Sequence, residues 1–332
     1  MLSEREIIDR LRRQAARVGP GLRLGIGDDC AVLDPPGPGR LTLITTDTLM
    51  EGVHFDLAWH PPELLGRKAV AVNVSDIAAS GGESRFALLS LAVPPGLAVE
   101  VLEGLTRGIM EALTRHRLTL IGGDTVASKG GLALSVTVLG EAAEGRVLYR
   151  SGARPGDLIW VSGGLGLAAL GLAICREGRV ELGRRYPELL AAHLDPAPEA
   201  ALGPALAASG LVSAMIDMSD GLATDLAQIG AESGVGARVF AERLPLPDSV
   251  REAAASLGLD PLPLAISGGE DYRLLFTSPP EAAGRLGGLA RLACGGQLFA
   301  VGEVVAGAGV RLEAEGRVTD IAFKGYDHFR GP

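Results

Sequence analysis

The sequence has few cysteines and no long apolar run. Its three cysteines, Cys30, Cys175 and Cys294, lie far apart and form no Cys-x-x-Cys pair. This spacing excludes a zinc ribbon and a disulfide framework. No stretch approaches 18 uncharged apolar residues, so we expect no membrane partner. The charged N-terminus also lacks the apolar segment of a signal peptide, and we therefore expect a cytoplasmic protein.

An excess of basic residues is also absent. The net charge of -9 argues against a nucleic-acid partner. The chain contains no G-x-x-x-x-G-K-[ST] motif, and neither H-R-D nor D-F-G occurs, which excludes P-loop enzymes and protein kinases. A phosphate-bearing substrate would need metal ions to offset so many carboxylates.

What the chain has is length, core-forming residues and glycine. It contains 332 residues, of which 47% are hydrophobic and 21% charged, and 47 glycines cluster in short loops. This composition is typical of a globular protein, and the length predicts two domains. Because residues 150–157 are rich in turn formers, we expect domains at 1–150 and 151–332.

Carboxylates recur where predicted strands end. Residues 41–46 are expected to form a buried strand that ends at Thr45, Thr46 and Asp47. Residues 118–121 form another expected strand, which runs into Gly123 and Asp124. In open α/β proteins, sites collect at the carboxyl ends of strands. Oxygen ligands of this kind suit Mg²⁺.

Four further places repeat the pattern. A predicted helix over 66–82 is almost wholly apolar but carries a polar stripe that includes Asp76, which must face solvent or be paired. Glycine or hydroxyl residues precede the other acids, and Ser219 is expected to be a helix N-cap. These pairs are Asp28/Asp29, Ser219/Asp220 and Gly269/Glu270. Each place alone is equally compatible with an exposed acidic turn. Six in one chain predict carboxylates that converge on several Mg²⁺ ions and a polyphosphate.

A rival pattern lies in the second half of the chain. Residues 164–169 match G-x-G-x-x-A after a predicted strand and before a predicted helix, which is the context of a dinucleotide-binding turn. No acid is placed convincingly about 20 residues later, and this alternative leaves the acidic strand ends unexplained. We therefore expect a structural turn here.

Eight separated motifs together resemble one family. In order they are GIGDDCAVL, TTDTLMEGVHF, AVNVSDIAASGG, LIGGDT, RSGARPGD, IDMSDGL, SGGEDY and KGYDHF. They are similar to the thiamine-monophosphate kinases, within the superfamily that includes aminoimidazole-ribonucleotide synthetase. The resemblance covers about residues 24–329. It implies an α/β (α+β) fold of two domains with mixed sheets flanked by helices, and an N-terminal domain that pairs in a homodimer.

The resemblance also implies an activity and a set of site residues. The activity is ATP-dependent conversion of thiamine monophosphate to thiamine diphosphate, with several Mg²⁺ ions. The implied metal ligands are Asp29, Thr45, Thr46, Asp47, Asp76, Asp124, Asp217 and Asp220. The implied ATP contacts are Gly123, Asp124, Arg150 and Ser219. The implied contacts to thiamine monophosphate are His54, Glu270 and Tyr326. Another member of the superfamily would share the metal site but not the last three residues.

Overall fold

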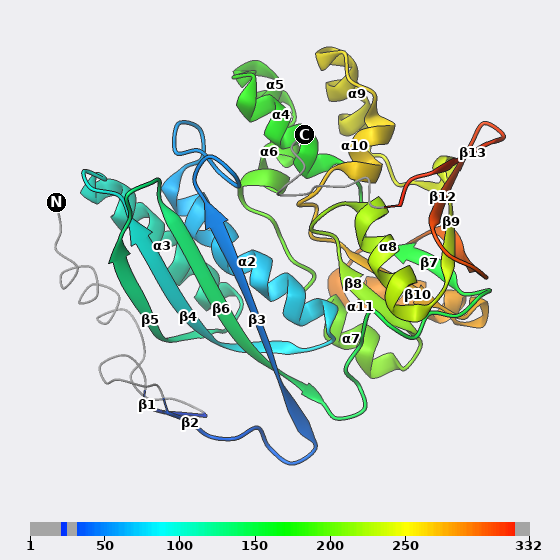
Figure 1. Cartoon of the computed structure of the whole chain (residues 1–332), viewed down its shortest axis with the longest axis horizontal. Coiled ribbons are helices and arrows are strands. Elements are labelled where there is room, and N and C mark those ends of the chain that lie inside the picture. Colours follow the sequence, from blue (N-terminus) through cyan, green and yellow to red (C-terminus); the bar gives the residue numbers. More distant parts are fainter. Residues whose placement is uncertain (1–20, 25–31, 323–332) are drawn as a thin grey trace. The chain divides into compact units, whose positions relative to one another are not determined.

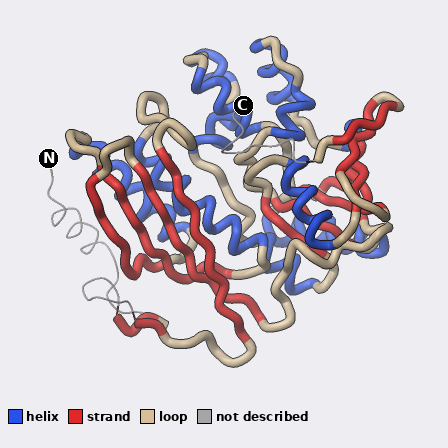
Figure 2. The backbone as a smooth tube through the Cα atoms, viewed as in Figure 1, coloured by secondary structure: helices blue, strands red, loops and turns tan. Residues whose placement is uncertain are grey.

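The computed structural model describes residues 21–24 and 32–322, and it divides into two units. The first comprises the chain up to Ile77 together with Gly82–Gly145, and the second comprises Ala78–Gly81 and the chain from Arg146. Figure 1 labels the elements of both units, and Figure 2 separates their helices from their strands.

The first unit is built on a four-stranded sheet in the order β3-β6-β4-β5. Its long strands are β3 (Arg40–Met50), β4 (Glu83–Val93), β5 (Thr119–Ala127) and β6 (Ala133–Ala143). β6 pairs antiparallel with β3 and with β4, whereas β4 and β5 are parallel. The short strands β1 (Leu22–Leu24) and β2 (Val32–Leu33) form a separate pair.

Two helices, α2 (Pro62–Ala79) and α3 (Val99–Arg115), cover one face of this sheet (Figure 1). α3 buries a stripe of apolar residues that includes Leu105 and Ile109, as helical periodicity predicts. The two helices approach closely at glycines. A Cβ at Gly108 would lie 1.9 Å from the Glu63 carbonyl oxygen, so no larger residue fits at this crossing.

The second unit contains a seven-stranded sheet in the order β13-β12-β9-β11-β7-β10-β8. Only the β9–β12 pair is parallel among its pairings. The strands are β7 (Leu158–Val161), β8 (Ala214–Asp217), β9 (Gly236–Phe240), β10 (Leu274–Ser278), β11 (Phe299–Val305), β12 (Val310–Ala314) and β13 (Arg317–Asp320).

Helices cover both faces of this sheet. α8 (Leu222–Ser233) packs on one face, and α7 (Leu202–Ser209) and α11 (Ala283–Cys294) pack on the other. The central strands alternate between the two cores, so Ile159 faces α8 while Trp160 stacks on Phe276 on the side of α11. The remaining helices are α4 (Leu167–Arg176), α5 (Val180–Arg185), α6 (Pro187–Leu194), α9 (Asp248–Leu257), α10 (Pro261–Ser267), η1 (Ala241–Arg243) and η2 (Pro280–Ala282).

The predicted fold class is confirmed, but two predicted strand ends are wrong. β3 continues three residues past Asp47, and β5 continues three residues past Asp124. β3 is also an edge strand that is only partly buried, with Ile44 69% exposed. The polar residues after each apolar run keep extended backbone because the neighbouring strand still pairs with them. At Asp47 and Asp124, the change from apolar to polar residues therefore reflects the surroundings of the side chains and does not mark the end of the strand.

Candidate active site

In the first unit, Thr45 on β3 is bonded to Asp76 on α2. The Thr45 hydroxyl donates to the Asp76 carboxylate at 2.5 Å. Asp76 is the one partly exposed residue in the otherwise buried stretch from Lys68 to Ala79. The pairing that the apolar helix predicted for this carboxylate is therefore present, and its partner comes from a strand that also carries Asp47.

The sheet places its predicted ligands on both of its faces. Thr45 faces α2, and Asp47 lies two residues further along the strand on the same side. Thr46 faces the other side, where Thr137 donates a hydrogen bond to its hydroxyl at 2.9 Å. Asp124 is in register with Ser90, which pairs with Ser135, so it shares this open face with Thr46.

Asp47 and Asp124 also lie at opposite edges of the sheet. The register aligns Asp47 with Val136, Leu89 and Gly123 in turn. Three strand spacings separate β3 from β5, which is about 14 Å. Gly123 is required here because a Cβ would lie 1.8 Å from the Leu89 carbonyl oxygen. One copy of this unit therefore does not bring the two carboxylates into one metal site.

His54 lies in the turn that follows β3. Its Nδ1 accepts a hydrogen bond from the Met50 backbone N–H at 3.1 Å. An accepting Nδ1 carries no proton, so the neutral ring is protonated at Nε2. The turn is closed by a bond from the Gly52 N–H to the Phe55 carbonyl, and Gly52 has φ 79°, which favours glycine.

In the second unit, the acidic loop after β8 is capped by a residue that the sequence analysis missed. Asp225 is fully buried, and its carboxylate accepts hydrogen bonds from the backbone N–H groups of Asp220 and Gly221 at 3.2 and 3.1 Å. Gly221, with φ 102°, is the N-cap of α8, so the prediction for Ser219 is wrong. Instead, the carboxylate of Asp225, four residues after Gly221, accepts hydrogen bonds from the backbone N–H groups of Asp220 and Gly221.

Burial raises the pKa of Asp225 well above its usual range, and the charges of Asp217 and Asp220 raise it further. Asp217 is itself 3% exposed at the end of β8. Three carboxyl groups therefore share a small, poorly solvated region. A divalent cation would offset this charge, since hard cations prefer carboxylate oxygens.

The Gly268–Tyr272 loop is joined to this acidic loop through its backbone. The N–H of Glu270 donates to the Ser219 carbonyl at 2.8 Å, and the N–H of Tyr272 donates to the Met218 carbonyl at 2.9 Å. Glu270 and Tyr272 have left-handed backbone angles, with φ 68° and 47°. Such conformations cost a non-glycine residue about 1–2 kcal/mol each, so the surrounding bonds must enforce them. The loop thus places Glu270 beside Ser219.

Asp271, between these two residues, occupies the start of α4. Its carboxylate oxygens accept bonds from the N–H groups of Gly166 at 2.7 Å and Ala168 at 3.0 Å. Burial raises its pKa to about 6, and these two N–H groups partly oppose the shift. A carboxylate therefore lies where the phosphate of a dinucleotide would bind, which supports a structural role for residues 164–169.

The remaining described candidate, Arg150, lies along α8. Its guanidinium donates to the Gln228 side chain at 2.5 Å. Gln228 follows the start of α8 by six residues, which is about 9 Å along a helix. The structure therefore places this arginine beside the helix and not in contact with the residues at its N-terminus.

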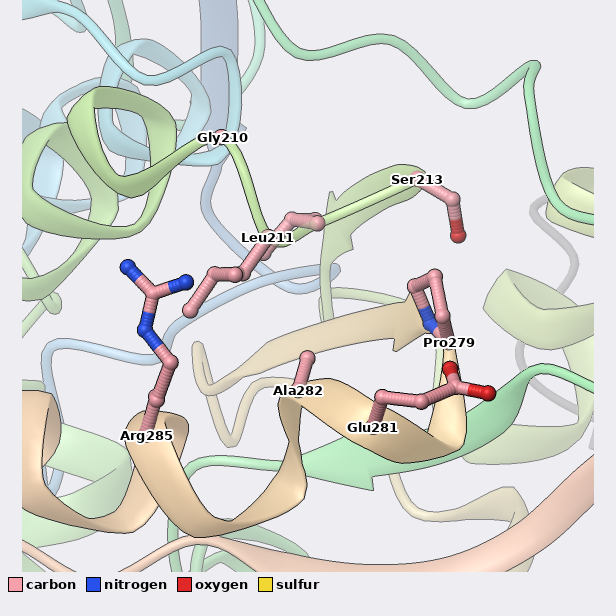
Figure 3. Close-up of a pocket in the computed structure, with 8 residues that line it drawn as sticks. Gly210, Leu211, Ser213, Pro279, Glu281, Ala282 and Arg285 are labelled. Carbon is pink, nitrogen blue, oxygen red and sulfur yellow. The ribbon is translucent and has the colours of Figure 1, made fainter.

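Neither a ready-made metal cluster nor the pocket at one end of β8 involves the predicted site residues among those that the structure describes. No group of three His, Cys, Asp or Glu residues among the described residues is arranged to hold a metal ion. A pocket of about 370 Å³ lies at the opposite end of β8 from Asp217, and its lining contains none of the predicted site residues. Figure 3 shows Arg285 and Leu211 on one side of this pocket and Ser213 and Glu281 on the other.

Comparison with known proteins identifies the family. Residues 27–142 match the AIR synthase related protein N-terminal domain, and residues 154–315 match the corresponding C-terminal domain. The thiamine-monophosphate kinase of Salmonella typhimurium is 39% identical over 93% of this chain and 92% of its own length. The chain belongs to the thiamine-monophosphate kinase family.

Solved structures in the thiamine-monophosphate kinase family share the fold. The enzyme from Stenotrophomonas maltophilia is 36% identical, with a TM-score of 0.83 over 95% of this chain and 98% of that one. A structure described as "AaThiL complexed with AMPPCP and TMP" is 30% identical, with a TM-score of 0.76 over 96% of this chain and 99% of that one. Across residues 21–24 and 32–322, every helix is too short or too polar to cross a bilayer.

Two residues that the family resemblance implies, Asp29 and Tyr326, lie outside the described residues. Conversely, three residues near the predicted site were missed. These are His193, Asp225 and Asp271. Asp271 was visible within SGGEDY, and Asp225 is an acid on an otherwise apolar helical stretch. Neither pattern distinguishes a carboxylate that binds backbone N–H groups from one that binds a metal.

Proposed function

We propose that this chain transfers the terminal phosphoryl group of ATP to thiamine monophosphate and releases thiamine diphosphate and ADP. The observation that carries the proposal is the backbone bond between Glu270, an expected acceptor contact, and Ser219, an expected ATP contact. A relative 30% identical over 96% of the chain has been solved with AMPPCP and TMP. Two loops in direct contact are a suitable place for two phosphate-bearing substrates to meet.

Phosphoryl transfer to this acceptor requires little acid–base catalysis. The attacking atom is a phosphate oxygen, which is already ionised at neutral pH. It forms a bond to the γ-phosphorus while the bond from that phosphorus to the bridging oxygen breaks, and ADP leaves with the electron pair. The difficulty is to bring two polyanions together, so catalysis depends on positioning and on electrostatic stabilisation.

Mg²⁺ fits the donors that the chain presents. The expected ligands are carboxylates and hydroxyls only, and the partly exposed Asp76 and the crowded Asp217 and Asp220 are suited to a hard cation. When bound, Mg²⁺ neutralises charge on the transferring phosphoryl group. The residues that would hold it are Asp29, Thr45, Thr46, Asp47, Asp76, Asp124, Asp217 and Asp220.

Substrate contacts follow the same assignment. Gly123, Asp124, Arg150 and Ser219 would contact ATP. His54, Glu270 and Tyr326 would contact thiamine monophosphate, which has two flat rings, one of them positively charged, that suit an acidic group and an aromatic face. Arg150 would have to exchange its bond to Gln228 for a phosphate.

We also propose a homodimer formed through the open face of the four-stranded sheet. This face exposes Ile44 (69%), Met50 (50%) and Val126 (51%), and exposed apolar groups on a sheet favour association. Asp124 lies on the same face, so a second copy packed against this face would lie beside Asp124. A cytoplasmic location fits the small number of cysteines, since reducing compartments contain few disulfides.

The test is a panel of acceptors offered with ATP and Mg²⁺. The purified chain should form ADP and thiamine diphosphate from thiamine monophosphate, with product mass confirmed by mass spectrometry. Thiamine, AMP and aminoimidazole ribonucleotide should give no product. Equal turnover of another acceptor, or turnover unchanged in the Asp217→Asn variant, would contradict the proposal.

A further inference from the structure

His193 is a buried imidazole on a mostly apolar helix. It lies near the end of α6, whose sequence is PELLAAHL, and its side chain is 1% exposed. The same helix contributes Leu189 to the core that it forms with α4 and α9. An apolar side chain would satisfy packing at this position without the cost of burying polar nitrogens. Packing alone therefore does not explain an imidazole at this position.

The reason lies in its contact with Glu270. The Nδ1 atom of His193 is 2.7 Å from a carboxylate oxygen of Glu270, whose side chain is 22% exposed. The two atoms lie within ion-pair distance, so the buried imidazole attracts the carboxylate when the ring is protonated. Such an attraction is stronger at a poorly solvated position than in water. The Glu270 carboxylate is thus contacted by a buried residue, while part of the side chain remains exposed to solvent.

The backbone beneath Glu270 is already fixed. Its N–H is bonded to the Ser219 carbonyl, its φ of 68° is left-handed, and the neighbouring Asp271 is attached to the start of α4. The side chain is different, because three rotatable bonds separate this backbone from the carboxylate. A fixed backbone alone does not select one carboxylate position. The ion-pair contact with His193 supplies the missing constraint.

We infer that His193 is a positioning residue that holds the Glu270 carboxylate in one orientation for the acceptor substrate. The inference rests on the proposed function, in which Glu270 contacts thiamine monophosphate. His193 itself touches neither substrate in this account. It acts by reducing the side-chain entropy that Glu270 loses when the acceptor binds. The signature is therefore a change in acceptor affinity that depends on Glu270.

The test is a double-mutant cycle with His193→Leu and Glu270→Ala in the full chain. In the presence of Glu270, His193→Leu should raise the KM for thiamine monophosphate about fivefold to tenfold. In the Glu270→Ala background, the same change should have an effect below about twofold, because contacting residues are coupled. The KM for ATP should change by less than about twofold throughout.

Two variants separate positioning from packing. His193→Asn places an amide N–H near the position of Nδ1 and should restore the KM to within about twofold. Tyr186→Phe is the matched control, since it removes a hydroxyl bond to Glu252 in the same helical cluster without touching Glu270. The KM for thiamine monophosphate should be unchanged in this control.

A measurement that needs no substrate keeps the inference testable if His193→Leu does not fold. The ¹⁵N resonances of the imidazole should show a protonated Nδ1 in the wild-type chain and a change in tautomer or protonation in Glu270→Ala. An unprotonated Nδ1 in the wild-type chain would overturn the inference. Equal KM effects in both Glu270 backgrounds, or an equal rise in the KM for ATP, would do so as well.

The outcomes distinguish this inference from the proposed function. An active chain whose KM for thiamine monophosphate does not depend on His193 overturns the inference alone. A wild-type chain that forms no thiamine diphosphate overturns the proposed function, and the inference with it.

Discussion

The two units hold their acidic residues in different ways. In the N-terminal unit, Thr45, Asp47 and Asp124 lie on regular strands of one sheet, spread over two faces and two edges. In the C-terminal unit, Asp220 and Glu270 lie on bent loops that the carboxylates of Asp225 and Asp271 fasten to helix starts. Regular strands need no special bonds to present a side chain, whereas bent loops do.

This difference suggests that changes in the two units have different consequences for stability and for chemistry. The loops of the C-terminal unit carry two left-handed residues and two carboxyl groups with raised pKa values, which are features that cost stability. Such costs are common where a site must be preorganised. In the strands of the N-terminal unit, neither Asp47 nor Asp124 has a left-handed backbone, so changes there should affect chemistry more than folding.

The largest expected effect is on turnover, from charge removal in the N-terminal unit. Asp47→Asn and Asp124→Asn keep side-chain size but remove an expected Mg²⁺ ligand. Each should lower kcat by two to three powers of ten, since one lost electrostatic stabiliser costs about 3–4 kcal/mol. Steady-state assays at limiting Mg²⁺ measure this, with the exposed Asp56→Asn as control. Near-normal turnover in either variant, with the unfolding midpoint unchanged, would remove that residue from the metal site.

The next effect is on stability and depends on pH, in the C-terminal unit. The pKa of Asp271 is raised to about 6 in the folded chain, from about 3.9 when unfolded. The folded state therefore binds the proton more tightly, and this contribution is fully present below about pH 4 and is lost as pH rises through about 6. Two pH units correspond to about 3 kcal/mol.

Chemical denaturation from pH 4 to pH 8 measures this contribution. The free energy of unfolding of the wild type should fall by about 3 kcal/mol relative to that of Asp271→Asn over this range. Asp248→Asn, at the exposed start of α9, is the control and should follow the wild type. Parallel profiles for the wild type and Asp271→Asn would show that the Asp271 carboxyl titrates normally.

A smaller effect compares one internal bond in each unit. Asp225→Ala leaves two N–H groups at the start of α8 without their acceptor and should lower the free energy of unfolding by about 1–2 kcal/mol. Thr45→Val removes the single bond to Asp76 and should cost about 0.5–1 kcal/mol. Urea denaturation measures both. A larger loss for Thr45→Val would reverse the contrast between the two units.

The last effect concerns acceptor binding. Glu270→Gln and Tyr326→Ala should each raise the KM for thiamine monophosphate more than that for ATP, by about fivefold to thirtyfold. Loss of a charge or of a cation–π contact corresponds to roughly 1–2 kcal/mol. Binding shared by the ground and transition states appears in KM with little change in kcat. If both variants weaken ATP binding and leave the acceptor's KM unchanged, these residues belong to the nucleotide site.

Much of the fold and the family could be predicted from the sequence. The predicted apolar helix over 66–82 corresponds to α2, and the family prediction is confirmed by relatives and family matches over most of the chain. Strand ends were less predictable. At Asp47 and Asp124, pairing with a neighbouring strand extends β structure through polar residues, and no local pattern reports that neighbour.

The types of residue in the candidate site could be proposed from the sequence, whereas their arrangement in space was harder to predict. The roles assigned to its acids stay predictions, and in one copy of the N-terminal sheet the strands that carry Asp47 and Asp124 are about 14 Å apart. The supporting residues were missed for a physical reason. His193, Asp225 and Asp271 act through contacts made by folding, across 77 residues of sequence in the case of His193 and Glu270. Spacing along the chain carries little information about such contacts.

The most direct test of the central claim follows the phosphoryl group itself. ATP labelled with ³²P at the γ-position is incubated with the purified chain, Mg²⁺ and thiamine monophosphate, and the products are separated by chromatography. Direct transfer predicts that the label appears in the terminal phosphate of thiamine diphosphate, with one ADP formed for each product and no transfer when Mg²⁺ is chelated. Label released as inorganic phosphate without thiamine diphosphate, despite ATP consumption, would contradict it.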